Sequence, residues 1–192
     1  MDPIHLSELK KKAEQEQALI VYTDEVLFRQ CPTLHQTWAA LNSQPQIPTR
    51  GQRNTQKVLG GISLYDGHFV YRHQTDYFNA ATYIEYLEQT LMPAFYQRGH
   101  RVYLIQDNAS YHKKPEVYDW FQENRKRIEV FLLPTYSPEL NAIERLWHYV
   151  RLNATHNRYF DTPEELCENL FRTFADIQNH PEKILGYLTP FF

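Results

Sequence analysis

The sequence predicts a mixed α/β domain in which helices cover a β-sheet. Short apolar runs of strand length come first, and later strands alternate with segments of helical periodicity. The chain has 192 residues, 42% of them hydrophobic and 15% aromatic, which is enough to bury a core. We therefore expect a single domain over residues 1–192, with residues 1–17 as a helical extension.

Five segments have the composition of strands. The first, Ala18–Tyr22, is apolar and is expected to stop at Thr23-Asp24-Glu25. Two others flank Tyr65-Asp66-Gly67, and this turn predicts a hairpin because Asp-Gly accepts the positive φ of a tight turn. The expected strands cover residues 18–22, 57–64, 68–73, 101–106 and 128–133.

The expected helices begin at recognisable capping residues. Asn79 is a plausible N-cap for a helix to Gln97, which Pro93 would bend or end early. Ser137-Pro138 is expected to start a helix that reaches about Asn153. The other expected helices cover residues 3–17 and 115–124 and begin at Thr162-Pro163, while residues 31–56 have the composition of a loop.

Charge and cysteine content narrow the function class. The net charge is −3, so a protein that binds DNA by bulk positive charge is disfavoured. Cys31 and Cys167 make no disulfide framework, and Cys31 with His35 lacks the second ligand pair of a zinc site. The N-terminus has no signal core and no apolar run approaches ~20 residues, so we expect a cytoplasmic protein without a membrane contact.

Three acids are placed where a catalytic site would form. Asp24 and Asp107 each follow an apolar strand segment, and Glu144 lies on the helix expected after the last strand. Glu144 lies at the edge of that helix's apolar stripe and is expected to face the sheet. The stripe consists of Leu140, Ile143, Trp147 and Val150.

Carboxylates that lie close together at strand ends favour divalent cations, because burying bare charges is costly. Hard oxygen ligands without a thiol or a histidine pair suit Mg²⁺ or Mn²⁺. Two such ions about 4 Å apart activate water and stabilise the leaving oxygen of a phosphodiester. The alternative is that each acid is a solvated strand cap.

The residues around these acids carry a family resemblance. The sequence has Asp24-Glu25 after an apolar strand, then Gln106-Asp107-Asn108-Ala109 with His112, then Ser137-Pro138-Glu139-Leu140-Asn141-Ala142-Ile143-Glu144-Arg145-Leu146-Trp147. These blocks resemble those of IS630/Tc1/mariner-type DDE transposases, over about Leu19 to Phe171. Asp107 and Glu144 are 37 positions apart, within the family's short-spacing range. One departure is Ala142, where the family usually has proline.

The resemblance implies an RNase H-like (retroviral integrase-like) fold with a mixed five-stranded sheet. In that fold the first acid lies on the first strand, the second at the end of the adjacent fourth strand, and the third on a helix after the fifth. It implies Asp24, Asp107 and Glu144 as catalytic and metal-binding residues, with two Mg²⁺ (or Mn²⁺) ions.

The resemblance also implies cut-and-paste DNA transposition of an insertion sequence. Mg²⁺-dependent cleavage at the transposon ends is followed by transfer of the 3′ hydroxyl to target DNA, typically at TA. A homodimer is expected in the active complex, associated with the nucleoid. The family usually carries helix-turn-helix modules before this domain, and none is expected before Leu19. The chain is therefore expected to be either a separate reading frame or a fragment, with end recognition elsewhere.

Four residues near the three acids can each be interpreted in two ways: Glu25, Asn108, His112 and Asn141. Glu25 is either near the metal or a solvated acid, and His112 either contacts DNA or is a loop histidine without a chemical role. Asn108 and Asn141 either hold ligands or phosphate, or are a turn residue and a helix-N-terminal residue. Trp147 is expected to pack in the core. DNA contacts are expected from Arg50, Arg53, Lys57, Lys113 and Lys114, whereas Arg125, Lys126 and Arg127 are expected to be plain surface.

Two other functions remain open. An RNase H-fold nuclease would share the metals but not strand transfer, and the third sequence block argues against it. A catalytically inactive transposase remnant, or a domesticated protein that binds DNA or a partner, would not need the acids. Their presence at Asp24, Asp107 and Glu144 argues against that alternative.

Overall fold

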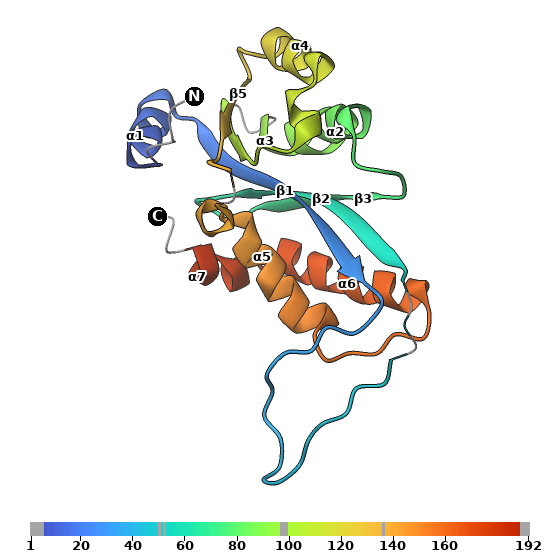
Figure 1. Ribbon diagram of the computed structural model, residues 1–192. Coiled ribbons are helices and arrows are strands. Elements are labelled where there is room, and N and C mark those ends of the chain that lie inside the picture. The colour runs from blue at the N-terminus through green and yellow to red at the C-terminus, as the bar shows by residue number, and fades with distance from the viewer. Residues whose placement is uncertain (1–5, 50, 52, 97–99, 136, 189–192) are drawn as a thin grey trace.

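The protein is built on one five-stranded sheet of mixed direction (Figure 1). The computed structural model describes residues 6–49, 51, 53–96, 100–135 and 137–188. The strand order is β3-β2-β1-β4-β5, with β1 antiparallel to β2 and parallel to β4. The bounds are β1 Leu19–Arg29, β2 Thr55–Ser63, β3 Phe69–Gln74, β4 Val102–Gln106 and β5 Ile128–Leu132. The predicted mixed sheet and hairpin are confirmed.

Helices cover both faces of the sheet (Figure 1). One core packs beneath α1 (Leu6–Glu16), α5 (Ile143–Val150), α6 (Pro163–Asn179) and α7 (Glu182–Leu188). The other packs beneath α2 (Ala80–Tyr86), α3 (Met92–Tyr96) and α4 (Pro115–Glu123). Because both faces are covered, every residue of β4 is buried, as its unbroken apolar run requires.

The first strand is longer than its sequence predicts. The prediction that β1 stops at Asp24 is wrong, because the strand continues to Arg29. Its second half is held by antiparallel pairing with β2, from Val21–Ser63 to Arg29–Thr55. The apolar residues of that half, Val26 and Phe28, alternate with exposed positions as in a half-buried strand. Asp24 therefore lies within the strand.

The helix after β3 contains a π-helical turn. Asn79 caps it as predicted, accepting a hydrogen bond from the Thr82 amide. The helix does not end early at Pro93: α2 continues through η1 (Leu87–Leu91), a π-helix, into α3. The wider i→i+5 spacing just before the proline offers one way to pass a residue that has no amide donor.

The helix that carries Glu144 starts later than predicted. Ser137 makes no capping bond with its side chain, and Pro138–Leu140 form a short 3₁₀ turn, η3. Extended backbone at Asn141 (φ −96°, ψ 104°) separates this turn from α5. Leu140 is consequently 44% exposed and not part of the buried stripe. Beyond α5 the helix continues as a π-turn, η4 (Arg151–Thr155).

The remaining elements agree with or extend the sequence expectations. Thr162 caps α6 as predicted, and α7 was not anticipated. Both cysteines are free. Among the described residues, no helix has the length and apolarity needed to span a bilayer. The predicted ends of two helices, Pro3 and Gln97, lie outside the described residues.

Candidate active site

The site begins where the two central parallel strands separate. The pairing between β1 and β4 ends at Tyr22 and Ile105. Asp24 lies two residues further along β1, and Asp107 directly follows the last residue of β4. Because both strands run in the same direction, the two aspartates leave the same end of the parallel pair.

A tryptophan and a glycine bring the third acid to this point. Gly60 on β2 is paired with Asp24, and a side chain at Gly60 would collide with the ring of Trp147, whose Cζ2 would lie 2.7 Å from the added carbon. Trp147 is 1% exposed and lies on α5, one turn after Glu144. The bare backbone of Gly60 therefore lets α5 approach the sheet closely enough to place Glu144 beside Asp24.

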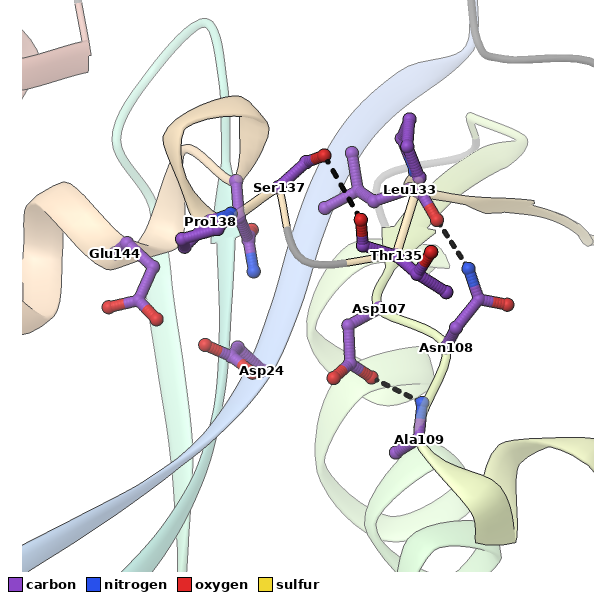
Figure 2. A pocket seen from close by; sticks show the side chains of 11 residues that line it. Asp24, Asp107, Asn108, Ala109, Leu133, Thr135, Ser137, Pro138 and Glu144 are labelled. Atoms are coloured by element: carbon purple, nitrogen blue, oxygen red, sulfur yellow. Dashed lines mark hydrogen bonds between the residues drawn. The ribbon is translucent and has the colours of Figure 1, made fainter.

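The three predicted acids line one cavity of about 360 Å³. Figure 2 shows Asp24, Asp107 and Glu144 directed toward a shared space, each from a different element. The structure therefore brings together the three residues that the sequence singled out. The cavity is completed by Asn108, Ala109, Leu133, Pro134, Thr135, Ser137, Pro138 and Asn141.

Among the three acids, Asp24 is the one whose ionised form is least favoured by its surroundings. Burial raises its pKa from 3.8 to about 8, with further contributions from the negative charges of Glu25, Glu144 and Asp107. Nearby, Asn141 is 4% exposed, and its Oδ1 atom has no hydrogen-bond partner. The cavity is thus lined by three carboxylates and an unused amide oxygen, and no Lys, Arg or His among the described residues forms an ion pair with Asp24 or Glu144.

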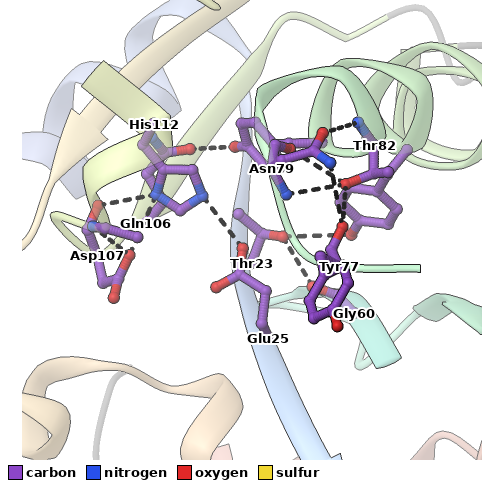
Figure 3. A network of polar contacts seen from close by, with 12 residues as sticks. Thr23, Glu25, Gly60, Tyr77, Asn79, Thr82, Gln106, Asp107 and His112 are labelled. Atoms are coloured by element: carbon purple, nitrogen blue, oxygen red, sulfur yellow. Dashed lines mark hydrogen bonds and ion pairs between the residues drawn. The ribbon is translucent and has the colours of Figure 1, made fainter. Parts of the chain in front are cut away.

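A histidine lies between Asp107 and Glu25 (Figure 3). The His112 side chain is 1% exposed; its Nδ1 is 3.1 Å from Asp107 Oδ1 and its Nε2 is 3.1 Å from Glu25 Oε1. Burial alone lowers the pKa of His112, but hydrogen bonds and charges from Asp107 and Glu25 outweigh it and raise the pKa to about 9. At neutral pH both ring nitrogens therefore carry protons and donate.

Glu25 and His112 form a compact polar group with Asp107, which lines the cavity. The ligand atoms of Glu25, Asp107 and His112 lie within 4.8 Å of one another, close enough to suggest a metal site. The His112 ring contacts both carboxylates at 3.1 Å, so the three groups form a chain of ion pairs. The hydrogen bond from His112 lowers the pKa of Asp107 and keeps that carboxylate ionised.

Comparison with known proteins agrees with this geometry. Residues 19–167, more than half of the chain, match the sequence profile of the family described as DDE superfamily endonuclease. The chain belongs to this family. It is also 27% identical, over 165 residues, to the "Insertion element IS630 uncharacterized 39 kDa protein" of Shigella sonnei, a match that covers 86% of this chain and 45% of that protein.

Solved structures show the same fold. The catalytic domain of Mos1 mariner transposase matches with a TM-score of 0.60 and 19% identity, over 96% of this chain and 84% of that one. The mariner Mos1 paired end complex with Mg matches with a TM-score of 0.60 and 22% identity, over 96% and 57%. The predicted RNase H-like fold is confirmed. The chain spans between 36% and 62% of the length of the curated relatives it matches.

Other residues of this DDE endonuclease domain hold the loops of the cavity in place. Asn108 donates from its side chain to the carbonyl of Leu133, which joins the segment after β4 to the segment after β5. The Ala109 amide donates to Asp107 Oδ1 over 2.9 Å. Ala142 has φ −60°, the value that a proline would impose, so its departure from the family pattern leaves the backbone suited to either residue.

Sequence reasoning missed two features of the site. The ring of His112 has Tyr83 and Tyr111 as neighbours, each with its ring centroid 4.4 Å away. Tyr83 in turn donates to Gln106, the residue before Asp107. Gly60 was also overlooked, although two adjacent glycines within an apparent strand are a signal of close approach by another element.

The basic residues predicted to contact DNA lie in two regions. Lys113 and Lys114 are exposed beside Asp107, and the positive charge of Lys113 helps to lower the pKa of that acid. Arg53 is exposed near the end of the loop between β1 and β2. Lys57 donates to the carbonyl of Asp76 and lies over the Tyr77 ring. Arg50 lies outside the described residues. DNA contact by these residues stays a prediction.

Proposed function

We propose that this chain is the catalytic domain of a transposase, with Asp24, Asp107 and Glu144 as its catalytic residues. The observation that carries the proposal is their convergence, from β1, the end of β4 and α5, on one cavity within the segment that matches the DDE endonuclease family. The likeness to an insertion-element protein supports a mobile-element substrate. Activity of the whole protein is part of the proposal, because the chain covers only part of its relatives.

The cavity fits divalent cations bound by oxygen ligands. Burial first, and then the neighbouring carboxylates, raise the pKa of Asp24, so a cation there would favour its ionised form, and the unpartnered Oδ1 of Asn141 offers a neutral oxygen. Asp24, Asp107 and Glu144 would hold Mg²⁺ or Mn²⁺, and we propose two ions. When bound, the ions would lower the pKa of water and stabilise the oxygen that leaves phosphorus.

Glu25 and His112 act as positioning residues for Asp107. Oδ1 of Asp107 is bonded by the His112 ring and by the Ala109 amide, so its second oxygen is the one left for the cavity. Glu25 holds the opposite side of the ring and keeps it protonated. His112 thereby fixes the orientation of Asp107 and offsets one of four clustered negative charges.

Two phosphoryl-transfer steps are proposed on DNA. In the first, a water oxygen bonds to phosphorus at the transposon end and the bond to the 3′ oxygen breaks, which frees a 3′ hydroxyl. In the second, that hydroxyl bonds to a target phosphorus, at TA in this proposal, and the target's own 3′ oxygen leaves. A homodimer would pair the two ends, and a helix-turn-helix segment or partner would recognise them.

Glu144→Gln tests the assignment because it keeps shape and polarity but removes a negative ligand. Exposed Glu139, on the turn before α5, provides the matched control Glu139→Gln. With transposon-end DNA, Mn²⁺ and a helix-turn-helix partner supplied, we expect Glu144→Gln to reduce cleavage to background while Glu139→Gln cleaves normally. DNA binding should hold in both.

Equal cleavage by the wild type and Glu144→Gln would overturn the role of Glu144. Failure of the wild type to cleave with either Mg²⁺ or Mn²⁺ would favour the inactive remnant. Melting curves of both variants identify a loss that comes from unfolding.

A further inference from the structure

Two long segments of this acidic protein, which lie against each other in the fold, contain no acid. The chain has 23 Asp and Glu residues and a net charge of −3, yet neither residues 26–58 nor residues 145–160 contain one. At the chain's average density, segments of this combined length would hold about six. They carry instead seven Lys and Arg residues: Arg29, Arg50, Arg53, Lys57, Arg145, Arg151 and Arg158. Because no acid offsets these seven groups, both segments have a positive net charge.

The structure joins these two segments. The base of the loop between β1 and β2 is bonded to the end of η4: the Asn157 amide donates to the Thr33 carbonyl over 3.0 Å, and the His35 amide donates to Asn157 Oδ1 over 2.9 Å. The Asn157 side chain also donates to the His35 carbonyl. Asn157 adopts φ +56°, a left-handed conformation that asparagine tolerates well. Figure 1 shows the loop extending from this base, below α5.

Three imidazoles gather at the junction. The ring of His35 lies 5.0 Å from that of His156, nearly parallel to it, and 6.1 Å from that of His148. The pKa of His156 is lowered by burial first, and then by the positive charges of His35, Arg151 and His148. The surroundings of His156 are thus basic, and no carboxylate in either segment balances them.

This basic junction is continuous with the cavity. Glu144, His148 and Arg151 are spaced i, i+4 and i+7, so they follow one side of α5 into η4. With a rise of about 1.5 Å per residue, His148 lies roughly 6 Å and Arg151 roughly 10 Å along the axis from Glu144. Arg145 and His148 are exposed and Arg151 partly so.

We propose that this acid-free face, made of His35, Arg145, His148, Arg151 and His156, binds the phosphate backbone of the DNA strand that leads into the cavity. The inference rests on the proposed function, since it takes DNA as the substrate. Guanidinium groups make charge-assisted hydrogen bonds to phosphates, and a neutral imidazole can add one N–H donor; contacts of this kind position DNA without reading its sequence. Without such a face, the carboxylates of the cavity would repel an approaching strand.

The test compares two double variants that each remove two positive charges. Arg145→Gln with Arg151→Gln removes them from the acid-free face. Arg125→Gln with Lys126→Gln removes them from the exposed turn before β5, at the opposite end of the parallel strands from Asp107. Binding of a labelled duplex of arbitrary sequence is measured by fluorescence anisotropy in EDTA, over a series of salt concentrations.

We expect the first variant to bind at least about tenfold more weakly and to lose roughly 0.9 from the log–log salt slope for each phosphate contact removed. The control should stay within about twofold of the wild type. Equal losses in the two variants would overturn the proposal.

Two further measurements distinguish DNA binding by this face from a defect in the metal site and from self-association. The thermal shift with Mn²⁺ should be retained by the Arg145→Gln, Arg151→Gln variant; no shift even in the wild type would contradict the proposed metal site and not the acid-free face. Leu34, Trp38 and Leu41 are strongly exposed on the same loop. Sedimentation tests whether the face instead joins two copies of the chain. The proposal is overturned if the wild type is a dimer that both Trp38→Ala and the Arg145→Gln, Arg151→Gln variant dissociate, while DNA affinity stays unchanged.

Discussion

Replacing Asp24 by asparagine should make the metal-free protein more stable. The folded protein holds this carboxyl at a pKa of about 8, against an ordinary value of 3.8 in an exposed chain. Between these two values the folded state binds a proton that the unfolded state does not. The wild type therefore loses stability as the pH rises from about 4 to about 8. Asparagine has no proton to lose, so its fold avoids that penalty.

The size of the effect follows from the shift. At pH 7 the difference spans about three pKa units, and at 1.36 kcal/mol per unit the carboxyl costs about 4 kcal/mol. The amide of asparagine is itself polar and keeps part of the burial cost, so we expect a net gain of about 2 kcal/mol. For a chain of this length, that gain raises the Tm by roughly 4–8 °C.

The assay is thermal unfolding in EDTA from pH 4 to pH 9, followed by circular dichroism. The difference in Tm between Asp24→Asn and the wild type should be near zero at pH 4 and largest above pH 8. Saturating Mn²⁺ should reverse the order, because it stabilises the wild type by mass action and the variant much less. Asp119→Asn, an exposed acid on α4, is the matched control and should change little.

An Asp24→Asn protein that is less stable than the wild type in EDTA at pH 8, with an unchanged spectrum, would refute this reasoning. That result would mean that the carboxylate of Asp24 is stabilised in the fold by a favourable partner. It would also remove the argument that excess negative charge at Asp24 invites a cation.

Two other substitutions test how the site is held together. His112→Gln should weaken Mn²⁺ binding about 10- to 100-fold in a calorimetric titration, because Asp107 loses the group that orients it. Adding Glu25→Gln to this variant should recover thermal stability but not the affinity for Mn²⁺. Unchanged Mn²⁺ affinity in His112→Gln would exclude the positioning role. Gly60→Ala should lower stability by about 1–3 kcal/mol in urea unfolding, because the new methyl group overlaps Trp147; a stability equal to that of the wild type would show that α5 is not held by this contact.

The sequence was enough to find the three acids but not to describe their surroundings. Asp107 follows an unbroken apolar strand and Glu144 lies on a strongly patterned helix, and the family resemblance of the flanking residues singled out both; the structure places both on the lining of one cavity. Asp24 looked like the end of a strand because polarity begins at Thr23. The strand continues because β2, more than 25 residues away along the chain, pairs with it, and such a pairing has no local signature.

The prediction of where α5 starts was wrong for a different reason. Ser137 and Pro138 are strong helix-starting residues, and they do start a turn, but the turn is 3₁₀ and ends at Asn141. Asn141 then takes an extended backbone, and its buried amide oxygen is left without a partner. A local rule scores only the capping residues. It does not register the extended backbone at Asn141, which places this residue on the lining of the cavity.

Asp24 and Asp107 differ in the direction of their pKa shifts. Both are aspartates from neighbouring parallel strands, yet His112 lowers the pKa of one while burial raises the pKa of the other. Pairs of carboxyl groups whose pKa values shift in opposite directions are frequent at functional sites. Asp107 is held ready in its ionised form by residues of the chain. A cation bound in the cavity would lower the pKa of Asp24 and favour its ionised form, so cation binding and the charge state of this carboxyl are coupled. Because burial raises the pKa of Asp24 without a cation, the affinity of the site for a cation should rise with pH.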